Sequence, residues 1–150
     1  MKKQMLMSVM ILGLMVLFNG RSAHAQDNGT VQADVPFTFY AGDTKFPAGK
    51  YTLKVLNDSD LTVIEISSTN GRMSALCQIE EAREENPSTS ELVFNKFGDQ
   101  YFLAKVLESG SSSGSALRES KYERRVEKNG IKAETRSIPT RHTSAQAMKR

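Results

Sequence analysis

Few side chains of this protein are of the types that most often do chemistry. The chain has two histidines, His24 and His142, and one cysteine, Cys77. General acid/base catalysis, nucleophilic triads and metal sites most often recruit histidine. His24 lies in a leader-like segment and His142 lies in polar sequence near the C-terminus, so the usual constellations cannot be assembled around them. We expect His142 to be an ordinary solvated residue.

Cys77 is a nucleophile by type, but its sequence context argues against reactivity. A thiol becomes reactive when it is partly exposed and lies beside a base or a cation. Cys77 instead alternates in phase with Met73, Ala75 and Ile79, which together would form the apolar face of a strand. We therefore expect a buried, inert thiol.

Carboxylates are the remaining candidates. The acidic segment Glu80–Glu85 offers oxygen ligands to a hard cation such as calcium, but adjacent carboxylates repel and are typical of solvated loops. Asp58 and Asp60 have the spacing that opens an EF-hand loop, yet Val63 stands where that loop requires glycine. Glu65 is the first residue to test if the protein is a hydrolase that works with carboxylates alone. The sequence thus predicts no catalytic, cofactor-binding or metal-binding residue.

The first 25 residues have the features of a secretory signal peptide. Lys2 and Lys3 precede an apolar run at Met5–Phe18, and Ala23–Ala25 provides the small-x-small pattern of a cleavage site. The apolar run is shorter than the roughly 20 residues that a membrane-spanning helix needs. We therefore expect Gln26–Arg150 to be exported to the periplasm or the extracellular space.

Removal of this leader changes the charge balance. The whole chain has 20 basic and 17 acidic residues, and three of the basic ones lie in the leader, so the mature chain is formally neutral. Acidic residues predominate up to Ala116 and basic residues from Leu117 onward. We expect an acidic body whose basic tail makes weak contact with anionic surfaces. No nucleic acid is expected as a partner, because the tail has no aromatic side chains for stacking on bases.

The body of the chain has the pattern of an all-β domain. Short runs rich in Val, Ile, Thr, Phe and Tyr are separated by turn residues. The connections are too short for crossover helices, so we expect an antiparallel meander. The last strand is apolar on both faces, which predicts a small barrel, a folded sandwich, or a cover such as a helix over the outer face. The six predicted strands are Val35–Tyr40, Lys50–Leu56, Asp60–Ile66, Arg72–Ile79, Glu91–Phe97 and Gln100–Leu107.

One short helix is predicted near the C-terminus. Its segment contains no glycine or proline and is followed by Gly130, and Ser120 and Glu123 have the spacing of a capping box. The mature chain is long enough for one domain with a packed core, and a single cysteine allows no internal disulfide. The predicted organisation is a signal peptide at 1–25, a flexible N-terminus at 26–33, a β domain at 34–108, a Gly/Ser linker at 109–116, a helix at 117–129 and a disordered basic tail at 130–150.

Three stretches resemble a known family. They are VPFTFYAGDTKFPAGKYTL at Val35–Leu53, ELVFNKFGDQYFLAKV at Glu91–Val106 and LRESKYERRVEKNG at Leu117–Gly130. Together they are similar to an uncharacterised family of small secreted proteins from acidobacteria and related soil bacteria. The resemblance implies a bacterial envelope or extracellular setting, and it implies no activity, ligand or active-site residue.

Three functions remain open. The one we favour is an exported, non-enzymatic envelope or secreted binding module, whose apolar β body holds a cavity for a small apolar ligand or an envelope component. The second is a structural or interaction protein of the envelope that acts through strand edges or through the basic tail. The third is the carboxylate-only hydrolase, which needs two carboxylates about 5–10 Å apart in one cleft. No cofactor is expected in any of the three.

Overall fold

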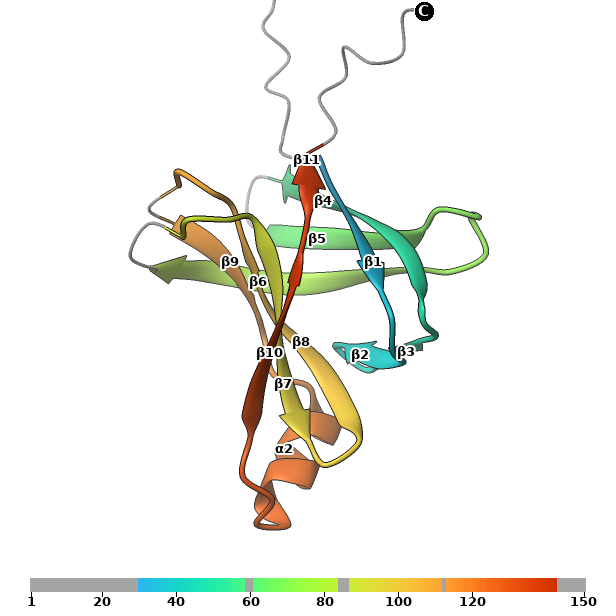
Figure 1. Ribbon diagram of the computed structural model, residues 1–150, viewed down its shortest axis with the longest axis vertical. Coiled ribbons are helices and arrows are strands. Elements are labelled where there is room, and N and C mark those ends of the chain that lie inside the picture. The colour runs from blue at the N-terminus through green and yellow to red at the C-terminus, as the bar shows by residue number, and fades with distance from the viewer. Residues whose placement is uncertain (1–29, 59–60, 84–86, 112, 143–150) are drawn as a thin grey trace, which may run out of the picture.

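The computed structural model describes residues 30–58, 61–83, 87–111 and 113–142, and these form a mostly-β structure with one short helix near the C-terminus (Figure 1). The predicted signal peptide and the last eight residues of the predicted tail lie outside these ranges. The elements are β1 (Thr30–Val35), β2 (Phe39–Ala41), β3 (Thr44–Phe46), β4 (Gly49–Asp58), β5 (Leu61–Ser68), β6 (Ser74–Arg83), β7 (Glu91–Phe97), β8 (Gln100–Leu107), β9 (Ser113–Leu117), α2 (Lys121–Lys128), β10 (Glu134–Pro139) and β11 (Arg141–His142).

The strands form one large sheet of 11 strands in the order β10-β7-β8-β9-β6-β5-β4-β1-β11. Strand β2 lies off this path and pairs with β3 and, in parallel, with β8 through Tyr40 and Phe102. The other described pairings are antiparallel. The predicted β class is confirmed, but the predicted barrel is wrong because the sheet is not closed.

Most of the predicted strands are present, and only the first predicted strand is interrupted. Strands β7 and β8 have the predicted bounds, and β4, β5 and β6 differ from theirs only at the ends. The predicted strand Val35–Tyr40 is instead two strands, because Pro36 has no N–H to donate and interrupts the ladder. Strand β1 begins at Thr30, inside the predicted flexible N-terminus, and buries Val31, Ala33 and Val35 on one face.

The largest departure from the predicted meander is β9, which lies within the predicted Gly/Ser linker. It sits between β8 and β6, so β6 and β7 are not neighbours in the sheet. A Cβ atom at Gly114 would lie 2.5 Å from Cδ2 of Leu107 and 3.0 Å from the carbonyl oxygen of Val106. Only glycine fits where β9 passes β8 this closely. At Gly114 the small residue therefore reflects close packing rather than flexibility.

The predicted disordered tail is also wrong for residues 134–142. Strand β10 pairs with β7, and β11 pairs with β1. Of the β10 residues only Ile138 is buried. The tail resembles disordered sequence because backbone pairing, rather than burial of an apolar face, holds this strand in place.

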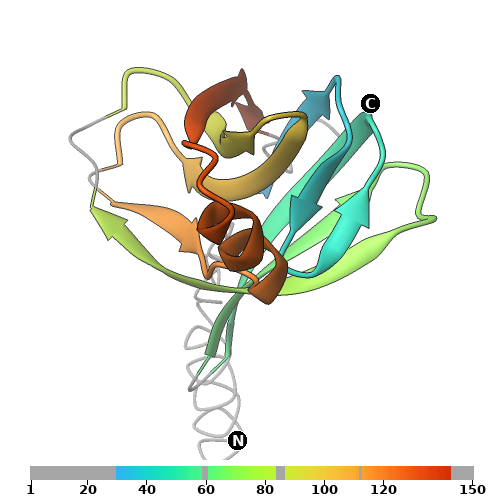
Figure 2. The ribbon, with the colours of Figure 1, turned by 90° about the horizontal axis from the view of Figure 1, so that it is seen from below.

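Helix α2 begins later than predicted, because Leu117 belongs to β9. Its N-cap is Ser120, whose side-chain oxygen accepts a hydrogen bond from the backbone N–H of Glu123 at 3.0 Å. The predicted capping pair is therefore confirmed. The helix covers part of the outer face of β8, as Figure 2 shows from below.

Two apolar clusters account for the two apolar faces of β8. The main core contains Leu103 and Val106 of β8 together with buried side chains from most of the other strands. Phe102 instead packs in a smaller cluster with Phe97 and Val126, beneath α2. The sheet therefore has a core on one face and the helix on the other.

Candidate functional site

A hollow lies where the sheet fails to close. Strand β11 pairs with β1 through Val31–His142 and Gln32–Arg141. In an antiparallel ladder the next residues would place Asp34 opposite Pro139. Proline cannot donate to a ladder, and the chain there pairs with β7 instead. Among the described strands, β1 and β10 thus face each other without pairing.

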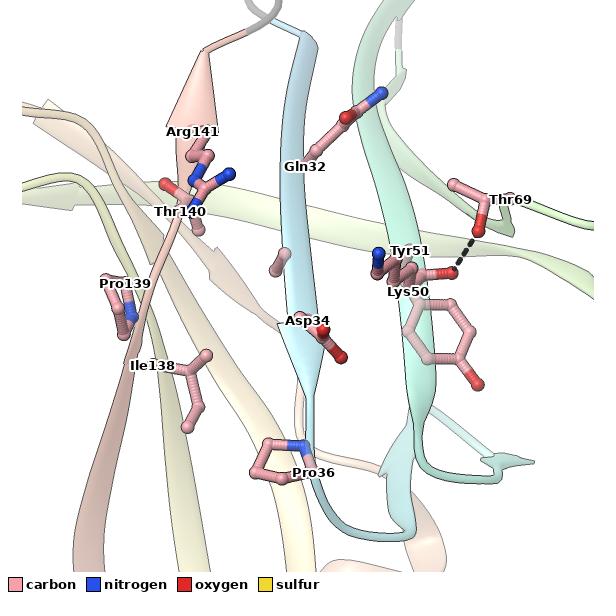
Figure 3. A pocket seen from close by; sticks show the side chains of 11 residues that line it. Gln32, Asp34, Pro36, Lys50, Tyr51, Thr69, Ile138, Pro139, Thr140 and Arg141 are labelled. Atoms are coloured by element: carbon pink, nitrogen blue, oxygen red, sulfur yellow. Dashed lines mark hydrogen bonds between the residues drawn. The ribbon is translucent and has the colours of Figure 1, made fainter.

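We call this hollow the seam groove; it has a volume of about 650 Å³ and extends from the gap between β1 and β10 across β1 to Lys50 and Thr69. Asp34 and Lys50 line it from β1 and β4, and Ile138 and Arg141 line it from β10 and β11 (Figure 3). Pro36 lies at the end of β1 and borders the same space. The volume falls within the range of about 300–1,000 Å³ that is typical of ligand sites.

The groove combines a buried wall with an exposed charged rim. Tyr51 borders the groove from β4; it is buried in the core, and its hydroxyl donates to the carbonyl oxygen of Pro47. Burial raises the pKa of Tyr51, which keeps the hydroxyl protonated and able to donate. Asp34 and Arg141 are exposed and bring one acceptor group and one donor group to the rim.

One polar atom of the groove lacks a partner. The side-chain oxygen of Thr140 is buried and makes no hydrogen bond to any described residue, although the backbone N–H of Thr140 donates to the carbonyl oxygen of Ser90 at 2.9 Å. A buried hydroxyl without a partner costs free energy.

The acidic residues singled out from the sequence are not brought together. Glu65 is half-buried on β5, opposite Lys54 and Leu76, and it does not line the seam groove. Glu80 is exposed on β6 and forms an ion pair with Arg118 at 2.9 Å. Glu84, Glu85, Asp60 and the side chain of Asp58 lie outside what the structure describes. No group of three or more potential ligand residues within the described ranges is placed to hold a metal ion.

Cys77 lies in the main core with 7% of its surface exposed. Burial, with a smaller contribution from the charge of Asp43, raises the pKa of the thiol, so little thiolate forms at neutral pH. We expect a thiol-specific reagent to modify folded protein on the order of 100-fold more slowly than urea-unfolded protein at pH 7.5. Equal rates for the two states would show that the thiol is accessible.

His142 makes a contact that sequence reasoning missed. Its Nε2 lies 2.9 Å from Oγ of Ser90, and the same Oγ accepts from the backbone N–H of Ser109 at 2.9 Å. The ring is exposed, in agreement with the expected solvated residue, but the contact with Ser90 was not expected. The two residues are 52 positions apart, and no sequence signal links them.

A serine hydroxyl hydrogen-bonded to a histidine is also the arrangement in which a serine hydrolase activates its nucleophile. Here Ser90 is buried, and no carboxylate within the described ranges hydrogen-bonds the other ring nitrogen of His142. Ser90 instead joins three segments, since its carbonyl oxygen accepts from Thr140 while its hydroxyl binds Ser109 and His142. We assign the pair to holding β11 beside the start of β7 and the end of β8.

Comparison of the chain with protein-family models, with curated proteins and with solved structures found no match. Within the described part of the chain, no helix combines the length and the apolar character needed to cross a bilayer. The fold and the groove define a mostly-β protein whose open sheet leaves a ligand-sized space between two strand edges.

Proposed function

We propose that this protein is an exported, non-enzymatic binding module that takes a short extended peptide into the seam groove. The observation that carries the proposal is the interrupted ladder between β1 and β10. Unpaired strand edges present rows of backbone donors and acceptors, and an extended chain can satisfy them by adding as a strand. The proposal combines the hypothesis of a binding module with that of an interaction protein acting through strand edges, because the proposed ligand site is itself a strand edge.

The open edge limits the length of the ligand. On β1 it runs from Ala33, after the last residue paired with β11, to Val35, before Pro36. At about 3.3 Å per residue this edge accommodates roughly three or four residues of an extended peptide. Pro36 and Pro139 remove donors at the two sides of the groove, which disfavours extensive pairing with another sheet.

The side chains around the groove favour a peptide of mixed character. The exposed Pro36 and Pro139 provide apolar surface, while Asp34 and Arg141 provide opposite charges at the rim. Backbone pairing would supply most of the affinity, and these side chains would select among sequences.

Export and the envelope setting belong to the same proposal. They rest on the signal-peptide features of residues 1–25 and on the resemblance to small secreted bacterial proteins. In the same proposal the sheet acts as a folded sandwich, whose two halves diverge at the groove and leave the ligand site between them.

Selection from a displayed library of random linear seven-residue peptides tests the proposal. We expect selected peptides to bind the wild-type chain and to lose about tenfold in affinity to the variant Asp34→Ala/Arg141→Ala, which removes one charge of each sign from the rim. The matched control Lys54→Ala/Glu81→Ala also leaves the net charge unchanged but alters exposed residues away from the groove. Its affinity should stay within about twofold of the wild type.

Backbone amide NMR shifts supply an independent readout. Addition of a selected peptide should shift the amides of Ala33–Val35 and Ile138, and leave those in the middle of β5 unchanged. A library that yields no binders would overturn the proposal. So would peptides that bind both double variants equally or shift amides elsewhere in the sheet.

A further inference from the structure

We propose that the outer face of α2 docks the protein on an anionic lipid bilayer. Four cations, which we call the basic stripe, lie on this helix at Lys121, Arg124, Arg125 and Lys128. Their spacing of i, i+3, i+4 and i+7 places them on one helix face. All four are exposed, and together they line a shallow hollow of about 300 Å³.

The opposite face of α2 is anchored, so the helix cannot turn the stripe away from solvent. The ring of Tyr122 packs 5.0 Å from that of Tyr40 and 5.7 Å from that of Phe102, measured between centroids. Val126 is buried in the same cluster. The buried carboxylate of Glu123 accepts a hydrogen bond from Nδ2 of Asn95 at 2.9 Å. The stripe is therefore held outward by contacts with β2, β7 and β8.

The stripe forms no ion pair within the described ranges, although the exposed carboxylates of Glu119 and Glu127 lie beside and on the same helix. None of its four side chains has a carboxylate oxygen of a described residue within the ion-pair distance of 4.0 Å, whereas Arg118 and Lys96 each have such a partner. Like charges at i and i+4 repel each other and destabilise a helix. An external anionic surface would relieve this repulsion, which is the complementarity on which the proposal rests.

The shape of the stripe favours a bilayer over a single polyanion strand. Between Lys121 and Lys128 the helix rises only about 10 Å, and α2 lies at the end of the molecule opposite β11 (Figure 1). A stripe this short can meet a plane of headgroups but cannot surround a polymer. No aromatic side chain belongs to the stripe, so base stacking would add nothing. The seam groove remains free in this orientation.

Co-sedimentation with vesicles tests the docking surface on the full chain. The vesicles are phosphatidylcholine alone or with about 30% phosphatidylglycerol. The variant Arg124→Gln/Arg125→Gln keeps good helix formers in α2 and removes two charges of the stripe. The matched control Lys54→Gln/Arg72→Gln removes two exposed charges from other parts of the surface. Since residues 1–25 are present in every variant, differences between variants report on the stripe.

We expect the wild type to bind the anionic vesicles more tightly than the neutral ones, and to lose this preference as salt is raised. The stripe variant should bind the anionic vesicles about 25-fold more weakly, or about fivefold per cation, and the control should bind within about threefold of the wild type. A second variant, Lys121→Gln/Lys128→Gln, should repeat the loss, which guards against an effect of one substitution on folding.

Two results would overturn the proposal. One is an equal loss of vesicle binding in the stripe variants and in the control, which would show that binding depends on net charge and not on the stripe. The other is a wild-type protein that does not bind anionic vesicles but binds a 20-nucleotide single-stranded DNA through the stripe in a salt-dependent way. That result would replace the bilayer with a soluble phosphate polymer as the partner.

Discussion

Replacing Phe94 with alanine is expected to lower the free energy of unfolding by about 3–5 kcal/mol. Phe94 lies on β7 with 0% of its surface exposed. Its ring packs edge-on against Phe37 and Phe39, with centroids 5.2 and 5.5 Å away. It therefore joins β7 to the segment that follows β1, and alanine would leave a cavity where the two parts of the sheet meet.

Urea unfolding at neutral pH measures this loss. Phe94→Leu keeps most of the volume and should cost about 1–2 kcal/mol, which gives a measurable value even if the alanine variant does not fold. Leu76→Ala is the matched control for an apolar residue that is 66% exposed, and it should change stability by less than about 0.5 kcal/mol. Similar effects at Phe94 and Leu76 would contradict the packing described for the core.

Replacing Asn95 with alanine is expected to destabilise the protein by about 1–3 kcal/mol at pH 7.5, because it removes a partner from a buried carboxylate. Glu123 is only 6% exposed, and Asn95 donates to its Oε1 at 2.9 Å. The backbone N–H of Ser120 also hydrogen-bonds this carboxylate, which completes the capping box. With one donor lost, the charge on Glu123 would be stabilised less well.

The pH dependence separates this effect from ordinary packing. Burial raises the pKa of Glu123 above its usual value of 4.5, although the hydrogen bonds from Asn95 and Ser120 oppose that shift. The folded state therefore binds the proton more tightly than the unfolded chain does. The cost of ionisation is fully present above the folded pKa, is relieved as pH falls through that pKa, and is absent below about 4.5.

Urea unfolding of the wild type, Asn95→Ala and Glu123→Gln at pH 7.5 and pH 4.5 measures these differences. Glutamine keeps an oxygen that can accept from Asn95, so Glu123→Gln should be more stable than the wild type at pH 7.5 and should depend less on pH. The destabilisation by Asn95→Ala should shrink at pH 4.5. A wild type and a Glu123→Gln variant with the same pH dependence would show that Glu123 does not carry a buried charge.

The Glu123 contacts also link stability to the proposed docking surface. The hydrogen bond from Asn95 and the rings of Tyr40 and Phe102 hold the inner face of α2 on the sheet. If Asn95→Ala lets the helix loosen, the basic stripe loses its fixed orientation while its charge is unchanged. The vesicle experiment applied to this variant would then separate the contribution of charge from that of presentation.

Local pattern predicted the parts of the fold that local forces decide. Strands β7 and β8 are apolar runs on either side of the turn at Gly98, and their bounds were predicted correctly. The Ser120–Glu123 pair was also predicted, because a capping box depends on four consecutive residues. The buried position of Cys77 follows in the same way from the alternation of its strand.

Strands held by non-local pairing were missed. Strand β9 has small residues because β8 passes close to Gly114, and this reason is visible only when both strands are in place. Strands β10 and β11 are mostly exposed, and their partners lie about 40 and 110 positions earlier in the chain. Polar composition without periodicity predicts disorder. These residues form strands because the free edges of β7 and β1 are available for backbone pairing.

The candidate site, like strands β9, β10 and β11, depends on contacts between distant parts of the chain. Its residues come from β1, β4, β10 and β11, and no motif in the sequence connects them. The amino-acid sequence by itself determined a single-cysteine β body, its main hairpins, a capped helix and a leader-like N-terminus, because each depends on neighbouring residues. Only the tertiary structure decided that the sheet stays open beside Pro139, since the register of β11 on β1 sets which residue must donate at that point.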